Sequence, residues 1–190
     1  MPSYFFDSSA IVKRYHQEPG SNWVRAVCDP RTRPPLYVSQ LAQVEVVAAL
    51  RRAGRRANFH ASYVASMVNT FGRHLMLSDP ARRDPMYRLV PLTSTVMAIA
   101  AMLCNTHWLM QPNPLRSLDA IQLACALATA ANLSDELLFV TADKRLLAIA
   151  PLEGLLDAFL LYGATTTSII QSSPVPLRPP PLPDDDGTPG

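Results

Sequence analysis

The sequence predicts an α/β domain built around a mostly parallel sheet. Short apolar runs of strand type alternate with amphipathic runs of helix type along most of the chain. Two apolar runs, at residues 4–6 and 137–140, are followed almost at once by an aspartate and then by a helix pattern. The second run, LLFV, is continuously apolar, which is typical of a strand buried on both faces of a parallel sheet.

Size and composition are those of an ordinary globular domain. The 190 residues are 48% hydrophobic and 17% charged, with a net charge of +2, and a chain of this length can bury a sizeable core. Cys28, Cys104 and Cys125 form no CxxC pair, so we expect neither a disulfide framework nor a zinc site, and we expect a reducing compartment such as the cytoplasm. No signal-peptide pattern and no membrane-length apolar run is present.

The folded part is expected to end before the last residues. Residues 1–164 carry the strand and helix patterns, and from residue 172 the composition changes. Six prolines precede the acidic triplet Asp184, Asp185 and Asp186. Residues 172–190 are therefore predicted to be a disordered or polyproline-type tail.

In the first half of the chain, the patterns predict strands at residues 4–6 and 36–39. The helices expected there cover residues 8–15, 22–28, 40–54 and 59–77. Ser39 is predicted to cap the third of these helices. In the last helix, Tyr63, Met67, Phe71 and Leu75 recur at helical spacing, which is typical of a core-facing stripe.

In the second half, strands are predicted at residues 87–92 and 137–140, and a last strand within residues 154–162. Helices are predicted from Thr93 or Ser94, which would cap the first of them, over residues 115–131 with Ser117 as the cap, and over residues 144–150. Residues 108–114 are expected to be irregular, because two prolines bar a continuous helix there.

Asp7 and Asp143 each follow a predicted strand directly. Both fit the ordinary role of a helix N-cap, which needs no further function. They also lie where the carboxyl ends of parallel strands meet, the edge at which ligands bind in open α/β sheets. The alternation of strands and helices therefore brings two carboxylates to one edge, whichever role each plays.

Two further acids lie on predicted helices. Glu45 lies beside the expected apolar stripe of Leu41, Val44, Val47 and Ala48. It is either a half-exposed helix glutamate or a carboxylate that needs a partner or a cation.

Asp119 lies in the first turn of its helix, where it interacts favourably with the helix dipole. It also shares a face with Gln122 and Leu123, so it could face inward. Four carboxylates at one edge would raise one another's pKa values, and a divalent cation would relieve that repulsion. An all-oxygen ligand set suits Mg²⁺, or Mn²⁺, better than zinc.

The acids stand in segments that resemble the PIN-domain family, most closely its VapC-type toxins. DSSAIVKRY resembles the first motif and carries Asp7, and SQLAQVEVVAALRR resembles the second and carries Glu45. LRSLDAIQLACAL, with Asp119, is the most specific match. VTADKRLLAIA resembles the fourth motif, with Thr141 and Asp143. The resemblance covers about residues 1–164.

The resemblance implies a PIN-like, Rossmann-like domain of three layers and a magnesium-dependent endoribonuclease that is the toxin of a toxin–antitoxin pair. Asp7 and Asp119 would hold the ion most directly, and Glu45 and Asp143 would complete its surroundings. Thr141 and Arg116 are weaker candidates for contact with substrate. The implied partners are an RNA substrate and a cognate antitoxin; a homodimer is expected from the apolar surface of the helices and not from the resemblance.

Two other function classes remain open. A catalytically idle PIN-like module that binds RNA or protein would need no ion. A phosphate-transfer enzyme with Asp7 as nucleophile is disfavoured, because a haloacid-dehalogenase-like phosphatase would want a second aspartate where Ser9 stands, and a receiver domain would want adjacent acids.

Arginines gather at the end of the third predicted helix, at positions 51, 52, 55 and 56. Positive charge there complements the helix dipole. A phosphate backbone or an acidic protein partner would suit the same residues. The stripe of Tyr63, Met67 and Phe71 adds apolar surface that dimerisation or antitoxin docking would cover.

Overall fold

The computed structural model of the protein describes residues 2–29, 31, 34–76, 86–109 and 114–159. Its strands are β1 (Ser3–Phe6), β2 (Leu36–Ser39), β3 (Arg88–Val90), β4 (Leu137–Thr141) and β5 (Leu156–Phe159). Its helices are α1 (Ser8–Tyr15), α2 (Ser21–Val27), α3 (Ala42–Arg56), α4 (Ala61–Met76), α5 (Ser94–Thr106), α6 (Ser117–Ala130), α7 (Lys144–Ile149) and the 3-10 turn η1 (Ala150–Glu153). The expected tail at residues 172–190 lies outside the described residues.

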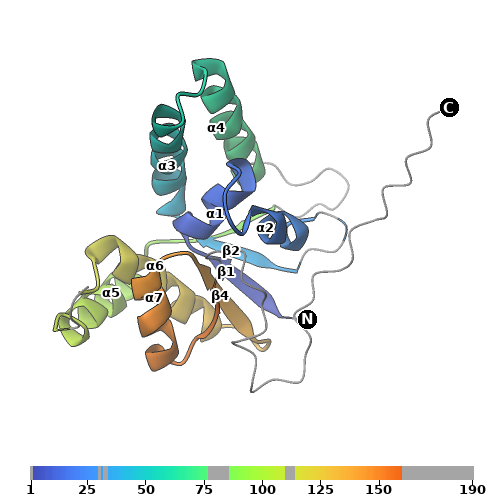
Figure 1. The fold of residues 1–190 in the computed structure, drawn as a ribbon. Helices are drawn as coiled ribbons and strands as arrows, with labels where there is room; N and C mark the ends of the chain where they lie inside the picture. The colour runs from blue at the N-terminus through green and yellow to red at the C-terminus, as the bar shows by residue number, and fades with distance from the viewer. Residues whose placement is uncertain (1, 30, 32–33, 77–85, 110–113, 160–190) are drawn as a thin grey trace.

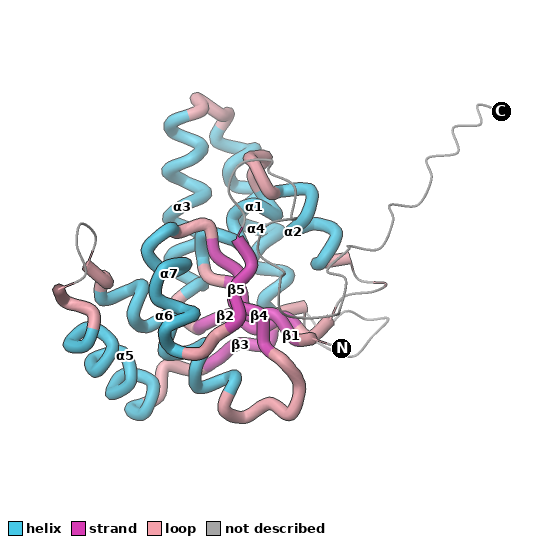
Figure 2. The backbone as a smooth tube through the Cα atoms, turned by 60° about the horizontal axis from the view of Figure 1, so that its bottom comes forward, coloured by secondary structure: helices cyan, strands magenta, loops and turns pink. Residues whose placement is uncertain are grey.

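The five strands form one sheet in the order β3-β2-β1-β4-β5 (Figure 2). All four strand pairings are parallel. The chain adds β2 and β3 on one side of β1, and then β4 and β5 on the other, so the order reverses between β1 and β4. The carboxyl ends of β1 and β4 therefore flank the place where open α/β sheets bind ligands.

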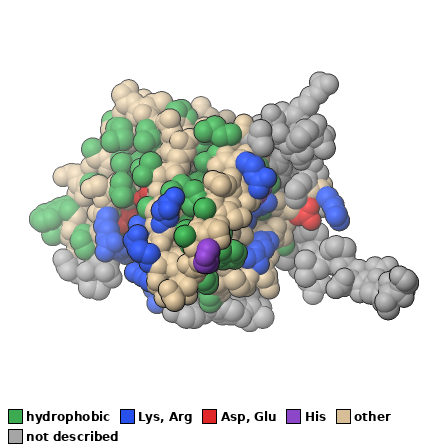
Figure 3. Space-filling model, turned by 90° about the horizontal axis from the view of Figure 1, so that it is seen from above, with side chains coloured by type: hydrophobic (Ala, Val, Ile, Leu, Met, Phe, Trp, Pro, Cys, Tyr) green, Lys and Arg blue, Asp and Glu red, His purple; other side chains and the backbone are tan. Residues whose placement is uncertain are grey.

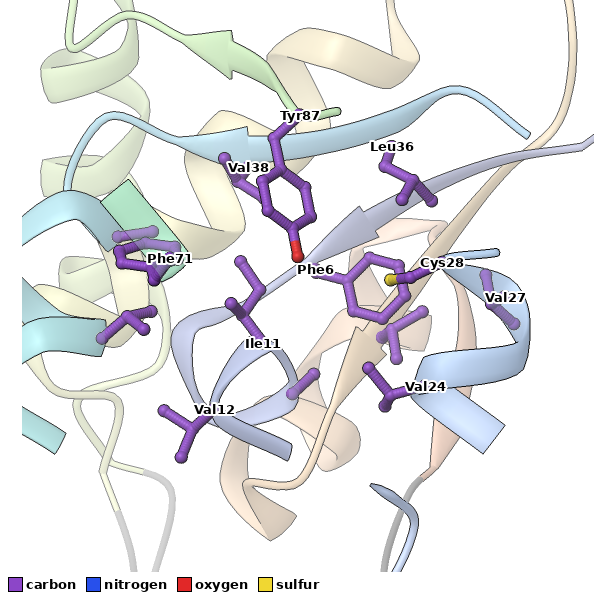
Figure 4. Close-up of a cluster of buried hydrophobic side chains, with 14 of the residues drawn as sticks. Phe6, Ile11, Val12, Val24, Val27, Cys28, Leu36, Val38, Phe71 and Tyr87 are labelled. Carbon is purple, nitrogen blue, oxygen red and sulfur yellow. The ribbon is translucent and has the colours of Figure 1, made fainter. Parts of the chain in front are cut away.

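Helices cover both faces of the sheet (Figure 1). Alternate residues of β1 point to opposite sides: Phe6 packs with α1 to α4, whereas Phe5 packs with α5, α6 and α7. Figure 4 shows the first of these cores, in which Phe6, Ile11 and Phe71 converge. The predicted three-layer α/β architecture with a mostly parallel sheet is confirmed.

Several local predictions were wrong. Ser39 does not cap α3; it ends β2, and its hydroxyl donates to Oε1 of Gln122 instead. Ser117 does not cap α6, whose N-cap position is Arg116, without a side-chain cap bond. The prediction for α5 is confirmed: the Thr93 side chain caps this helix by accepting a hydrogen bond from the Val96 amide.

The buried face of α3 also differs from the predicted stripe. Ala42, Val46 and Leu50 are buried, whereas Val44 is 69% exposed. In α4, Met67 and Phe71 are buried as expected, but Tyr63 is half exposed. No helix in the described part of the chain is both long and apolar enough to cross a membrane.

Candidate metal and nuclease site

Asp7 is held rigidly between β1 and α1. Its Oδ1 accepts from the Ala10 amide at 2.9 Å and from the Ser9 hydroxyl at 2.7 Å, which makes it the N-cap of α1. Its Oδ2 accepts from the Thr141 hydroxyl at 3.0 Å. The side chain is almost fully buried, and burial raises its pKa to about 7 despite these hydrogen bonds. Asp7 is therefore a carboxyl group that holds its proton close to neutral pH.

Thr141 joins this acid to the second strand end. Its hydroxyl oxygen accepts from the Asp143 amide at 3.0 Å while the hydroxyl donates to Asp7. Ser9 adds a parallel link, because its oxygen accepts from the Ala142 amide at 2.9 Å. The turns after β1 and β4 are thus fixed to each other across the switch point of the sheet.

Asp143 is the N-cap of α7 and is paired with Arg145. Its Oδ1 accepts from the Arg145 amide at 2.8 Å and from Nε at 3.2 Å, and its Oδ2 accepts from Nη2 at 2.8 Å. Burial acts to raise the pKa of Asp143, but the hydrogen bonds and charge of Arg145 outweigh it, so the pKa lies below its usual value. Asp143 is ionised at neutral pH.

Asp119 occupies the first turn of α6 and faces inward. Its Oδ2 is buried and accepts no hydrogen bond from the described residues. Nη2 of Arg145 lies 3.7 Å away from it. Burial, and secondarily the charge of Asp143, raises the pKa of Asp119. A buried carboxylate oxygen without a donor is costly, and a cation beside it would remove that cost.

Glu45 lies in the first turn of α3 and enters the site through a polar network. Its Oε2 accepts from the Ser8 hydroxyl and from Nε2 of Gln122, both at 2.5 Å. Gln122 is itself buried and is anchored by the Ser39 hydroxyl, which donates to its Oε1 at 2.7 Å. Residues from β2, α1 and α6 therefore fix this glutamate of α3.

The structure brings the four predicted acids to one edge. Asp7 and Asp143 share Thr141, Asp143 and Asp119 share Arg145, and the charges of Glu45 and Asp143 reach Asp119. They do not form a closed cage: among the described residues, no three His, Cys, Asp or Glu side chains are already arranged to hold a metal ion. The donor set is all oxygen, and the unpartnered oxygen of Asp119 fits a hard cation such as Mg²⁺ or Mn²⁺.

Positive charge surrounds these acids. Arg116 is exposed at the start of α6. Its charge adds to the lowering of the pKa of Asp143 and partly opposes the burial that raises the pKa of Asp119. Figure 3 shows acidic side chains beside several basic ones on the face seen from the top of Figure 1. An edge that carries both carboxylates and basic side chains suits an anionic substrate that binds beside a cation.

Sequence reasoning missed four residues of the site: Ser8, Ser9, Gln122 and Arg145. Ser8 and Ser9 directly follow Asp7, and Gln122 shares the face of Asp119. Their positions close to the acids in the sequence could have indicated that they hydrogen-bond to acids of the site. Arg145 stands two residues after Asp143, which it pairs with, but its approach to Asp119 had no such signal, because that contact joins two separate helices.

Residues 4–151 match the model of the PIN domain family. The chain belongs to the PIN domain family. Among its relatives are Ribonuclease VapC45 and Ribonuclease VapC49 of Mycobacterium tuberculosis, each 34% identical over 131 residues that cover 67% of this chain and 77% of the relative. Ribonuclease VapC46 of the same organism is 45% identical over 67 residues, which cover 32% of this chain and 50% of the relative.

A solved structure shares the PIN fold seen here. It is the crystal structure of VapBC2 from Rickettsia felis bound to a DNA fragment from their promoter. The match has a TM-score of 0.52 and 11% sequence identity, and it covers 83% of this chain and 98% of that chain. The predicted resemblance to VapC-type PIN domains is therefore confirmed at the level of fold and family.

Proposed function

We propose that this PIN domain is a magnesium-dependent endoribonuclease and the toxin of a toxin–antitoxin pair that acts in the cytoplasm. The observation that carries the proposal is the buried Oδ2 of Asp119, which accepts no hydrogen bond from the described residues and lies at the same edge of the sheet as the three other carboxylates. The VapC relatives, which are named ribonucleases, support the choice of RNA as substrate.

Asp7 and Asp119 would hold Mg²⁺ most directly, with Glu45 and Asp143 beside it; Mn²⁺ would suit the same oxygen ligands. When bound, the ion supplies an activated water and neutralises charge on the scissile phosphate. Thr141 and Ser9 orient Asp7, and Gln122 with Ser8 orients Glu45. Asp7 would release its proton to solvent when it holds the ion, and the products would carry a 3′-hydroxyl and a 5′-phosphate.

Two protein partners belong to the proposal: a cognate antitoxin and a second copy of the chain. Apolar side chains exposed on the helices support it, among them Val44, Tyr63, Met97 and Met102. Burial of exposed apolar side chains against a protein partner is favourable. Sedimentation of the chain alone tests the homodimer, and sedimentation with the product of the neighbouring reading frame tests the antitoxin. A chain that stays monomeric in both experiments would contradict both partners.

The catalytic proposal is tested by RNA cleavage with the purified full chain in Mg²⁺ and in EDTA. We expect cleavage only with the metal, and loss of at least about a hundredfold in Asp7→Asn and Asp119→Asn, since each removes a charge that is used in the transition state. Glu136→Gln is the matched control, because Glu136 is an exposed acid next to β4 at the opposite edge of the sheet. Full activity in Asp119→Asn, or equal activity in EDTA, would refute the proposal.

One observation favours a second candidate, an idle PIN-like module that binds RNA or protein. Arg145 pairs with Asp143 and lies close to Asp119, so the protein's own cation can neutralise the acids. A Mn²⁺ titration separates the two candidates. A nuclease binds the ion in a saturable manner and loses that binding in Asp119→Asn. In an idle module, Asp119→Asn leaves the titration unchanged.

A further inference from the structure

Two arginines of α3 lie on the same face of the helix as Glu45. Arg52 and Arg56 follow Glu45 by seven and eleven residues. At 3.6 residues per turn, both fall within about 20° of Glu45 around the helix axis. Arg51 and Arg55, from the same cluster, fall about 120° and 80° away. Two arginines of the cluster, Arg52 and Arg56, therefore lie on the helix face that carries Glu45, and the other two lie on different faces.

The arginines in line with the site are open to solvent and available for binding. Arg52 and Arg56 are exposed, and Glu45 is half-buried in the first turn of the same helix. In the described part of the chain, no carboxylate forms an ion pair with either arginine. Between Glu45 and Arg52 the helix carries only small or aliphatic side chains on this side, Ala48 and Ala49. Nothing bulky on this face separates the carboxylate from the first guanidinium.

The spacing suits a nucleic-acid strand. A rise of 1.5 Å per residue places Arg52 about 10 Å and Arg56 about 16 Å from Glu45 along the helix axis. A polyanion with regularly spaced phosphates matches two guanidinium groups at increasing distance from the cutting site. The helix extends away from the sheet together with α4 (Figure 1), so a strand can follow it outward.

We infer that Arg52 and Arg56 form a phosphate track along α3 that holds the single-stranded RNA on one side of the scissile bond. This inference rests on the proposed ribonuclease function and adds to it the direction in which the substrate leaves the acids. The contacts reach phosphates only, so the track sets the path of the strand along α3 and does not read its sequence.

The test measures RNA binding without cleavage. A fluorescein-labelled single-stranded RNA is titrated into full-length Asp119→Asn protein over a range of salt concentrations. Adding Arg52→Ala and Arg56→Ala to this protein weakens RNA binding by roughly tenfold at low salt, because two exposed charge contacts are lost. The magnitude of the slope of log affinity against log salt falls by about 1.4, because two phosphates are no longer neutralised. Arg51→Ala with Arg55→Ala, which removes the same charge, leaves both values close to those of the parent protein.

Lysine at both track positions restores the salt slope, because each lysine still neutralises a phosphate. Circular dichroism and the unfolding midpoint verify that each variant is folded. Equal losses in the two alanine pairs overturn the track, since bulk charge then explains the binding. Unchanged RNA binding in both alanine pairs also overturns the track, and binding of a protein partner is then the role left for these arginines. If the Asp119→Asn protein binds no RNA at all, the track is overturned, whereas RNA cleavage by the wild-type protein in Mg²⁺ decides the ribonuclease function separately.

Discussion

Nη2 of Arg145 lies 3.7 Å from Oδ2 of Asp119, a buried oxygen that accepts no hydrogen bond from the described residues. The same nitrogen lies 2.8 Å from Oδ2 of Asp143. One guanidinium therefore occupies the space between two acids from different helices. A metal ion that binds both acids must compete with this arginine for them.

Replacing Arg145 with alanine should strengthen metal binding. Without the guanidinium, Mn²⁺ affinity rises by about two- to fivefold, the factor that corresponds to one partly exposed ion pair. Arg145→Lys keeps a cation and should stay close to wild type. Calorimetric titration of the three proteins is the measurement, and weaker or unchanged binding in Arg145→Ala would show that the arginine does not compete with the ion.

Asp7 should make the stability of the metal-free protein depend on pH. Its pKa is about 7 in the folded protein and near its ordinary value of 3.8 in the unfolded chain. Between these values the folded state holds the extra proton, so the free energy of unfolding falls as pH rises from about 4 to 7. Asp7→Asn removes this term and should be more stable at pH 8 by about 1 to 3 kcal/mol.

The check is urea unfolding in EDTA at several pH values for Asp7→Asn, wild type and the control Glu136→Gln. The advantage of Asp7→Asn should shrink to nothing once the pH falls well below the ordinary pKa of 3.8, where the folded and unfolded wild-type chains both hold the proton. Stability curves that run parallel for Asp7→Asn and wild type would mean that Asp7 is ionised throughout.

Gln122 should act as a positioning residue for Glu45. Gln122→Leu removes one of the two donors to Glu45 and leaves the buried Ser39 hydroxyl without its acceptor. We expect a loss of about 1 to 3 kcal/mol in unfolding free energy and a fall in kcat with little change in KM. Ser39→Ala, which removes only the anchor of the amide, should show the smaller effect on both. A destabilised Gln122→Leu protein with unchanged kcat would restrict Gln122 to a structural role.

Gly54 sets how closely α3 and α4 approach each other. A Cβ at Gly54 would collide with Cγ2 of Val64. Gly54→Ala should therefore destabilise the fold by about 1 to 3 kcal/mol through overpacking. Adding Val64→Ala makes room and should recover part of the loss, as a double-mutant cycle would measure. Additive losses in the double variant would indicate that the two residues do not meet.

The sequence was sufficient for the fold because each strand–helix unit is specified locally. Asp7 and Asp143 show why two interpretations of one residue can both hold. Each is the helix N-cap that its position predicts, and each also lines the acidic edge. The meeting of Asp7 and Asp143 could be predicted from the sequence because parallel strands end at the same edge of the sheet.

The details that depend on tertiary contact were not predictable. Helix α3 contains apolar residues on several sides, so its periodicity fits more than one stripe, and packing against α1 and α4 selects Ala42, Val46 and Leu50. Ser39 is a good helix cap by type, but Gln122 from α6 takes its hydroxyl. Arg145 approaches Asp119 only because α6 and α7 meet in the folded chain.

The central claim is that acids from four segments form one cation site. Calorimetric titration of Mn²⁺ into metal-free wild type, Asp119→Asn and Glu136→Gln tests it most directly. The account predicts saturable binding in wild type and Glu136→Gln, and loss of that binding in Asp119→Asn. Wild-type protein that takes up no ion, or Asp119→Asn protein that binds as wild type does, would contradict it.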